Sequence, residues 1–334
     1  MNSYNRRSFI KTTIVSSVAL QFLDDSAVFA SPADGKRVGI IGLDTSHSVA
    51  FAKALNAVSS DRVYDGYKVV AAYPQGSKDI ESSVKRIAGY TEDVKKLGVE
   101  ITTSIKDLLS KVDVVLLETN DGRLHLEQAL EVFKAGKRMF IDKPVAGTLS
   151  DTIAIFEASK KYKIPVFSAS SLRYIKGIEA IDKSKVLGAD TYSPAVLEKT
   201  HPDFFWYGVH GVETLYTVMG TGCKSVSRVS TPDTDIVVGV WADGRTGTFR
   251  GTRTGKHDYG GTVFTQDGNK ILGPYAGYEP LLVDIIKYFK TGEVPVTPEE
   301  TIEIFTFMEA ADESKRQGGK SIMLESVLSK AKKK

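Results

Sequence analysis

Residues 38–47 read VGIIGLDTSH, and residues 48–55 continue as SVAFAKAL. A short apolar run ends at Gly42, a turn of small polar residues follows, and apolar side chains then recur with helical spacing at Val49, Ala52 and Leu55. Strand, tight turn and helix in this order open a nucleotide-binding α/β domain. The free backbone N–H groups and positive dipole end of such a helix suit a pyrophosphate. The stretch therefore predicts a nucleotide-binding domain early in the chain.

The loop inside this stretch departs from the usual G-x-G-x-x-G fingerprint, because its three positions read Gly42, Asp44 and His47. The second glycine normally lets the phosphates approach the backbone, whereas Asp44 places a side chain and a negative charge there. The architecture is thus predicted clearly, while a pocket that no longer binds a dinucleotide stays open as an alternative.

The whole chain has 334 residues, 42% hydrophobic and 25% charged, which predicts two domains rather than one small core. The net charge of +3 is small, and no basic block accompanies a groove-like motif. We therefore expect that the protein does not bind nucleic acid. Cys223 is the single cysteine, which excludes an internal disulfide.

The first 30 residues are predicted to be a targeting segment. Residues 5–11, NRRSFIK, resemble the twin-arginine export motif, and an apolar stretch follows over 12–23. Residues 28–30 (VFA) then offer small side chains at the positions that a signal peptidase recognises. We expect cleavage near Ala30, a periplasmic destination, and no stable membrane insertion of the processed chain. The alternative is an ordinary N-terminal helix or anchor, although the apolar run is short for a span and contains Gln21.

Residues 68–73 are predicted to form the second parallel strand, which ends in Tyr73. Dinucleotide enzymes usually carry an acid here that holds the adenosine ribose, and this chain has none. Ser77 and Lys78 follow and offer contacts to a 2′-phosphate, which would favour NADP over NAD. A turn at Pro74 and Gly76 with solvent-facing polar groups is the alternative.

Strands and helices then alternate up to residue 170, which predicts a doubly wound parallel sheet in a Rossmann-like domain over residues 31–170. From residue 171 strands dominate, and two helices close the chain, which predicts an α+β domain with a mainly antiparallel sheet over 171–334. The expected helices are 80–97, 124–134, 150–162, 175–182, 278–290 and 298–316; the later strands are 112–117, 138–141, 165–170, 188–197, 225–231, 235–241, 245–253 and 260–266.

Four elements in fixed order carry a resemblance to a known family. They are Thr119-Asn120 after a strand, His125 opening a helix, the turn 135–137 (AGK), and Asp142-Lys143-Pro144 after the next strand. This pattern resembles the Gfo/Idh/MocA oxidoreductases, relatives of glucose–fructose oxidoreductase and inositol dehydrogenase, over nearly all of the processed chain. The pair at Arg173 and Tyr174 also matches the family.

The resemblance implies an NAD or NADP cofactor, an open-faced sheet in the second domain, and a homodimer or homotetramer. It also implies hydride transfer to or from a small-molecule carbohydrate. The residues predicted to line the cofactor cleft are Gly42, Leu43, Asp44, Thr45, Ser46, His47, Tyr73, Ser77, Thr119, Asn120, His125, Asp142, Lys143 and Arg173.

The resemblance also implies the catalytic residues. Lys143 takes the place of the family lysine near the nicotinamide and the reacting hydroxyl. The family pattern Asp-x-Gly-x-His-x-x-Asp matches residues 206–213, with Trp206 in place of the first Asp and Glu213 in place of the last, and it makes His210 the general base. Glu213 lies one helical turn on, where it would orient His210 or help bind a metal. The alternatives are a surface lysine in a turn and a histidine that only packs at a helix start.

No metal is predicted, because the spacing of His47, His125, His210, Asp44 and Glu213 fits no metal signature. The sequence thus predicts an exported NAD(P)-dependent oxidoreductase acting on a sugar, polyol or glycoside. Two alternatives stay open: an NAD-assisted glycosidase or lyase that works through a keto sugar, and a non-enzymatic sugar- or partner-binding protein.

Overall fold

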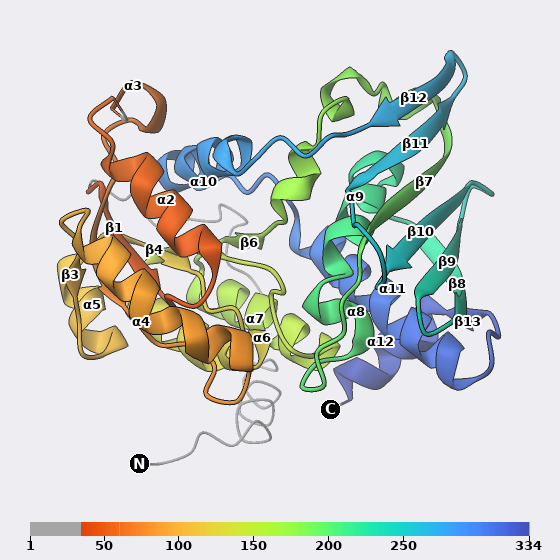
Figure 1. The fold of residues 1–334 in the computed structure, drawn as a ribbon. Coiled ribbons are helices and arrows are strands. Elements are labelled where there is room, and N and C mark those ends of the chain that lie inside the picture. Colours follow the sequence, from red (N-terminus) through yellow and green to blue (C-terminus); the bar gives the residue numbers. More distant parts are fainter. Residues whose placement is uncertain (1–34, 60, 334) are drawn as a thin grey trace, which may run out of the picture.

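The computed structural model describes residues 35–59 and 61–333, which form two halves side by side, each with its own sheet (Figure 1). The predicted targeting segment over residues 1–30 lies outside the described residues. Within the described part, no helix combines the length and apolar character needed to cross a bilayer.

The first half holds a six-stranded sheet in the order β3-β2-β1-β4-β5-β6, and every neighbouring pair is parallel. The strand order reverses between β1 and β4, so a crevice opens there beyond the carboxyl ends of the strands. The strands are β1 (Arg37–Ile41), β2 (Lys68–Tyr73), β3 (Glu100–Ile101), β4 (Val114–Leu117), β5 (Arg138–Ile141) and β6 (Val166–Ser168).

Helices cover both faces of this sheet, as its doubly wound prediction requires. One face packs on α5 (Ile105–Lys111), α6 (Gly122–Lys134) and α7 (Leu149–Tyr162). The other packs on α2 (Ser46–Asn56), and α4 (Glu81–Lys95) and the short α3 (Asp61–Tyr64) lie beside α2. Strands buried on both faces read as near-continuous apolar runs, which is why β4 is simply VVLL.

The cover of the second face is completed from the far end of the chain by α10 (Glu279–Thr291). Its apolar side packs on the sheet, and the Tyr288 hydroxyl donates to the Pro165 carbonyl oxygen at 2.5 Å. Arg138 Nη1 donates to the Phe289 carbonyl oxygen at 2.7 Å. The first half therefore depends on a helix that lies more than a hundred residues beyond its last strand.

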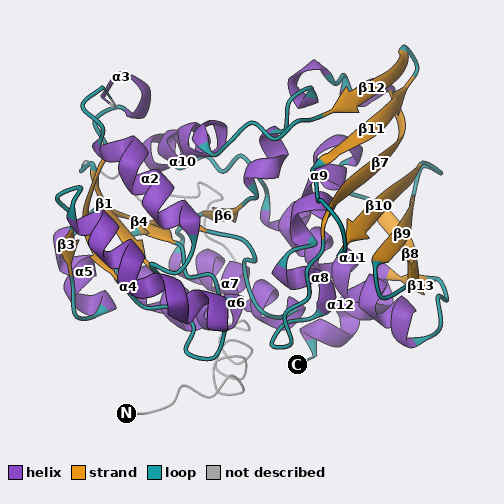
Figure 2. Ribbon diagram, viewed as in Figure 1, coloured by secondary structure: helices purple, strands orange, loops and turns teal. Residues whose placement is uncertain are grey.

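The second half is a seven-stranded sheet in the order β12-β11-β7-β10-β9-β8-β13, antiparallel except for the parallel pair β7 and β10. This confirms the α+β prediction. Figure 2 shows the helices on the side of the sheet that faces the first half. The strands are β7 (Val186–Pro194), β8 (Cys223–Ser230), β9 (Thr234–Trp241), β10 (Thr246–Thr252), β11 (Gly260–Thr265), β12 (Gly268–Leu272) and β13 (Ile322–Met323); the helices are α8 (Asp203–Trp206), α9 (Val209–Met219), α11 (Pro298–Arg316) and α12 (Leu324–Lys332).

The helix predicted over residues 175–182 is wrong. The chain forms short 3-10 turns instead: η2 (Ser171–Tyr174), η3 (Ile178–Ala180) and η4 (Lys183–Lys185). Gly177 has a φ of +93°, and a Cβ there would lie 2.7 Å from the Ile271 carbonyl oxygen. A left-handed residue pressed against a strand interrupts the helix, and the local apolar spacing does not reveal it.

Candidate functional site

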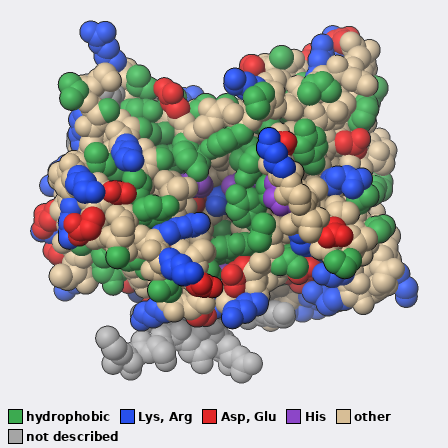
Figure 3. Space-filling model, viewed as in Figure 1, with side chains coloured by type: hydrophobic (Ala, Val, Ile, Leu, Met, Phe, Trp, Pro, Cys, Tyr) green, Lys and Arg blue, Asp and Glu red, His purple; other side chains and the backbone are tan. Residues whose placement is uncertain are grey.

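The candidate site lies in the hollow between the two halves, where histidine side chains reach the surface (Figure 3). Its floor is the crevice between β1 and β4. Gly42 closes β1 with a φ of +96°, and a Cβ there would lie 2.4 Å from the Thr119 backbone nitrogen. Only glycine lets these two loops approach so closely, so the first glycine of the fingerprint is a steric requirement.

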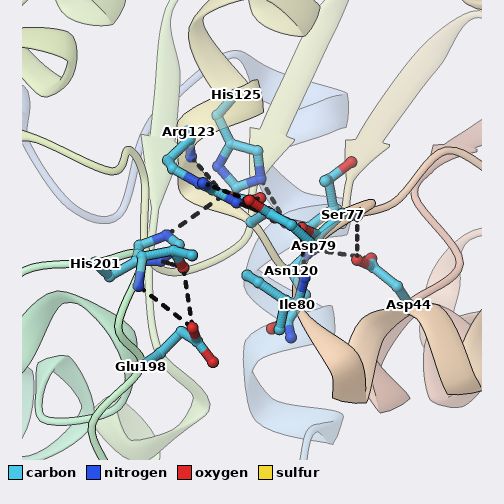
Figure 4. Close-up of polar contacts among 12 residues, drawn as sticks. Asp44, Ser77, Asp79, Ile80, Asn120, Arg123, His125, Glu198 and His201 are labelled. Atoms are coloured by element: carbon cyan, nitrogen blue, oxygen red, sulfur yellow. Dashed lines mark hydrogen bonds and ion pairs between the residues drawn. The ribbon is translucent and has the colours of Figure 1, made fainter.

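Asp44 occupies the centre of the crevice and is fully buried. Its Oδ1 accepts from the backbone N–H of Asn120 at 2.9 Å, and its Oδ2 accepts from that of Ser77 at 3.2 Å (Figure 4). Burial raises the pKa of this carboxyl, although both N–H groups lower it. The chain thus ties the loops after β1, β2 and β4 together with a carboxylate of its own.

Arg123 at the start of α6 spans the same crevice. Its Nε donates to Asp121 Oδ1 at 2.9 Å and its Nη1 to Asp79 Oδ2 at 3.1 Å, which joins α6 to the loop after β2 (Figure 4). The Arg123 guanidinium lowers the pKa of Asp79 to about 2. Ser77 Oγ donates to Asp79 at 2.9 Å and the side chain is buried, so it serves this network rather than facing open solvent.

Three observations test whether a dinucleotide fits. The first turn of α2 has no side-chain cap, so its N–H groups remain for a phosphate. Within the described residues, the buried Thr119 hydroxyl has no hydrogen-bond partner. A cavity of about 220 Å³ opens beside Tyr73 and Gln75 at the carboxyl end of β2, the adenosine end of a Rossmann crevice. These residues fit a dinucleotide, with Asp44 as the added negative charge.

The predicted catalytic lysine and histidine both line the hollow. Lys143 follows β5 and is 6% exposed, with Nζ 4.0 Å from Asp142 Oδ2. His210 lies at the start of α9, buried, with Nδ1 2.6 Å from Ser170 Oγ. Burial, with the nearby charges of Lys143 and His47, holds the pKa of His210 well below its usual range. His210 is therefore a neutral imidazole able to take up a proton.

Glu213 makes different contacts from those expected. Its Oε2 accepts from the Ser170 N–H at 2.9 Å, and its Oε1 lies 3.3 Å from Arg173 Nη1. No hydrogen bond joins it to His210 among the described residues; Ser170 connects the two instead. Burial raises the pKa of Glu213 to about 7, against the lowering effect of Arg173.

Two residues expected to line the cofactor cleft have other partners. Arg173 is 9% exposed and pairs with Glu213 and Glu300, and its place in the cofactor cleft stays a prediction. His125 is fully buried, with Nε2 2.5 Å from the Thr119 carbonyl oxygen and Nδ1 3.3 Å from that of Val145. His125 shapes the loop after β4 from below, since both ring nitrogens face backbone.

Sequence reasoning missed Glu118, which is as fully buried as Asp44 and Asp142. It is fully buried directly after β4, and its Oε2 lies 4.0 Å from His47 Nδ1. His47 Nδ1 also lies 2.9 Å from Asp142 Oδ2. Burial and the neighbouring Asp142 raise the pKa of Glu118 well above its usual range. The available signal was an acid placed immediately after a wholly apolar strand.

Residues 36–170 match the family model described as "Oxidoreductase family, NAD-binding Rossmann fold", the Gfo/Idh/MocA family. The first domain belongs to the Gfo/Idh/MocA family. This confirms the family predicted from the sequence, with its oxidoreductase class and NAD-type cofactor. No curated protein matches the sequence.

Solved structures share the fold of both halves. A probable dehydrogenase from Thermotoga maritima is 21% identical with a TM-score of 0.69, covering 87% of this chain and 99% of its own. Myo-inositol 2-dehydrogenase from Lactobacillus plantarum is 17% identical with a TM-score of 0.69, covering 86% and 98%. Myo-inositol dehydrogenase from Lactobacillus casei, solved with NAD(H) and myo-inositol, is 16% identical with a TM-score of 0.69, covering 86% and 96%.

Proposed function

We propose that this Gfo/Idh/MocA protein is an exported NAD(P)-dependent oxidoreductase that acts on a hydroxyl carbon of a sugar, polyol or glycoside. The observation that carries the proposal is the pair of Lys143 and neutral, buried His210 beside one hollow at the carboxyl edge of the Rossmann sheet. A lysine and a base at the same hydroxyl are what oxidation of an alcohol requires of the protein.

The roles follow from the contacts. The cofactor, when bound, supplies the hydride acceptor, with its pyrophosphate at the first turn of α2 and its adenosine near Tyr73. Lys143 donates a hydrogen bond to the reacting hydroxyl oxygen. In the tautomer that carries its proton on Nδ1, His210 donates to Ser170 Oγ, and its Nε2 is then free to take the hydroxyl proton. Glu213 positions this group through Ser170 and Arg173.

Tyrosines on the second domain favour a polyhydroxy substrate. Tyr207 and Tyr259 share a hydrogen bond of 3.0 Å beside the His210 ring, and Tyr275 Oη lies 2.9 Å from Ser171 Oγ. Burial raises the pKa of Tyr259 and Tyr275, so both remain donors. Aromatic rings with polar tips suit the faces and hydroxyls of a sugar or cyclitol. The inositol ligands of the solved relatives agree with this class.

Export rests on the NRRSFIK stretch at residues 5–11. An exported enzyme needs a cofactor that stays bound and is recycled, either by a second substrate or within each turnover. The second mode describes the NAD-assisted glycosidase or lyase. The twin-arginine route carries folded proteins, which suits a chain that leaves the cytoplasm with its cofactor in place.

The open face of the second sheet suits a second copy of this chain in a homodimer or homotetramer. Apolar side chains on four of its strands are exposed, and an apolar patch of this kind marks an association surface. They are Leu187, Tyr192, Val229, Val238, Val240 and Ile271. Light scattering on the wild type and on Val238→Lys measures the mass; a monomeric wild type contradicts this assembly.

The testing experiment expresses the chain from Ser31, denatures it without added nucleotide, and measures released NAD(P) by mass spectrometry. Inositols, sugars and glycosides are then screened with the wild type, Lys143→Ala and His210→Ala. We expect bound nucleotide and a turnover that both variants lose. Free sugar released without net NADH identifies the glycosidase. No nucleotide bound or taken up at millimolar concentration contradicts the oxidoreductase and favours a binding protein.

A further inference from the structure

Three side chains converge at the carboxyl edge of the first sheet. His47 lies in the first turn of α2, which follows β1, while Glu118 directly follows β4 and Asp142 directly follows β5. These three strands are adjacent in the sheet. One donor atom from each residue lies within 4.8 Å of the other two, and all three residues are buried. The ends of β4 and β5 and the start of α2 thus bring two carboxyl groups and one imidazole nitrogen to a single point.

The carboxyl group of Glu118 has no hydrogen-bond partner among the described residues, whereas Asp142 Oδ2 lies 2.9 Å from His47 Nδ1. The nearest basic atom given for Glu118 is His47 Nδ1 at 4.0 Å, and Lys143 Nζ lies 4.0 Å from Asp142 Oδ2. A buried carboxylate without a partner is costly, so such a group normally pairs, stays protonated or binds a cation.

We propose that His47, Glu118 and Asp142 bind one divalent transition-metal cation of the Zn²⁺ or Mn²⁺ class. A nitrogen with two carboxylate oxygens is a mixed donor set: imidazole suits Zn²⁺, and carboxylates suit Mn²⁺. This differs from the metal set weighed in the sequence, because His125 and Glu213 have other partners and Glu118 was not considered.

The geometry needs only small adjustment to hold such an ion. Bonds of about 2.1 Å in a tetrahedral site separate the ligand atoms by about 3.4 Å. His47 Nδ1 lies 2.9 Å from Asp142 Oδ2 and 4.0 Å from Glu118 Oε2, on either side of that value. Three protein ligands leave at least one position for water or a substrate oxygen, the arrangement of catalytic rather than structural sites.

The site goes beyond the proposed function and does not depend on it, since binding is measured without turnover. The chain from Ser31 is stripped with chelator and titrated with Zn²⁺ and, separately, with Mn²⁺, by calorimetry and metal analysis. We expect one ion per chain in the wild type. In Glu118→Gln and Asp142→Asn we expect the affinity to fall by about a hundredfold or more, because each loses a ligating charge.

Thermal melting provides a second, opposed readout. Without metal, Glu118→Gln should melt no lower than the wild type, because the carboxyl group that it removes is buried without a hydrogen-bond partner among the described residues. With metal, the wild-type melting temperature should rise and that of Glu118→Gln should not. Glu303→Gln and His257→Ala in the second domain are the matched controls and should bind as the wild type.

A wild type that binds no stoichiometric Zn²⁺ or Mn²⁺ overturns the proposal and leaves Glu118 and Asp142 sharing a proton. Wild-type affinity in both Glu118→Gln and Asp142→Asn overturns it as well, because the ion would then sit elsewhere. Bound nucleotide without bound metal would contradict the metal site but not the oxidoreductase proposal. Bound metal without nucleotide would contradict the oxidoreductase proposal but not the metal site.

Discussion

Each half of the protein buries a cluster of charge, and the two clusters are built in opposite ways. In the second domain, Arg228 is fully enclosed, with Nε 2.8 Å from Asp235, Nη1 2.6 Å from Asp312 and Nη2 2.7 Å from Asp203. In the first domain, Glu118 has no hydrogen-bond partner for either oxygen among the described residues. A buried cluster whose charged groups pair with one another stabilises the fold. A buried cluster with unpaired polar groups indicates a site for a ligand.

The largest expected effect breaks the satisfied cluster. Arg228→Ala leaves the buried Asp312 without its guanidinium partner, leaves Asp235 and Asp203 with one cation fewer, and removes a guanidinium stacked 4.1 Å from the Phe204 ring. We expect a loss of about 3–5 kcal/mol in the free energy of unfolding, measured by urea denaturation. A Glu118→Gln protein under the same conditions and without metal should be at least as stable as the wild type. Equal losses in the two variants would remove the distinction between the clusters.

The second effect concerns catalysis beside the unsatisfied cluster. His210→Ala should lower kcat by about 10²–10⁴-fold, because the proton acceptor is lost. The nucleotide affinity should remain near that of the wild type, because His210 is assigned to the substrate. Steady-state rates and nucleotide titrations on the same preparation check this, with His257→Ala as the control. A parallel loss of nucleotide binding would mean that His210 supports the crevice instead.

A smaller effect is expected at Asp44, the charge that lies in the crevice. Asp44→Asn should strengthen dinucleotide binding by roughly tenfold, because like-charge repulsion of the pyrophosphate disappears. The same change should lower the free energy of unfolding by about 1 kcal/mol. The introduced amide oxygen would accept from one of the two backbone N–H groups, and the amide NH₂ group would then face the other N–H, which is also a donor. Fluorescence titration and thermal melting measure the two quantities. Unchanged affinity would place the pyrophosphate away from this loop.

The smallest effect is on pH dependence. The pKa of Glu213 rises from 4.5 to about 7 on folding, so the folded protein holds this proton more tightly. Its contribution to stability therefore falls as the pH rises from about 4.5 to 7. Buried His125 and His210, with lowered pKa values, oppose this trend. The charged and polar groups that face Glu213 are Arg173, Glu300, Tyr174 and Ser170. Subtracting the wild-type stability from that of Glu213→Gln at each pH isolates the contribution of Glu213. A difference that does not change with pH contradicts the raised pKa.

The sequence predicted the elements better than the contacts. The β1–α2 turn follows from Gly42, and the placement of Lys143 and His210 follows from motifs that sit at strand and helix ends. The partner of Glu213 did not follow, because helical spacing puts it near His210 without showing that Arg173 and Ser170 compete for it. Glu118 was missed because its surroundings depend on segments that are far apart in the sequence and meet only in the folded sheet. No local sequence pattern shows that its carboxyl group lacks a partner among the described residues.

The helix α10 ties the order of synthesis to the first domain. The strands of the first sheet leave the ribosome before α10 completes the cover of their second face, and the hydrogen bonds of Tyr288 to Pro165 and of Arg138 to Phe289 form only after most of the chain has been made. A fragment ending at residue 170 should therefore expose an apolar face and associate with itself. In this respect the protein is a single folding unit, because the domain that is synthesised first is completed last.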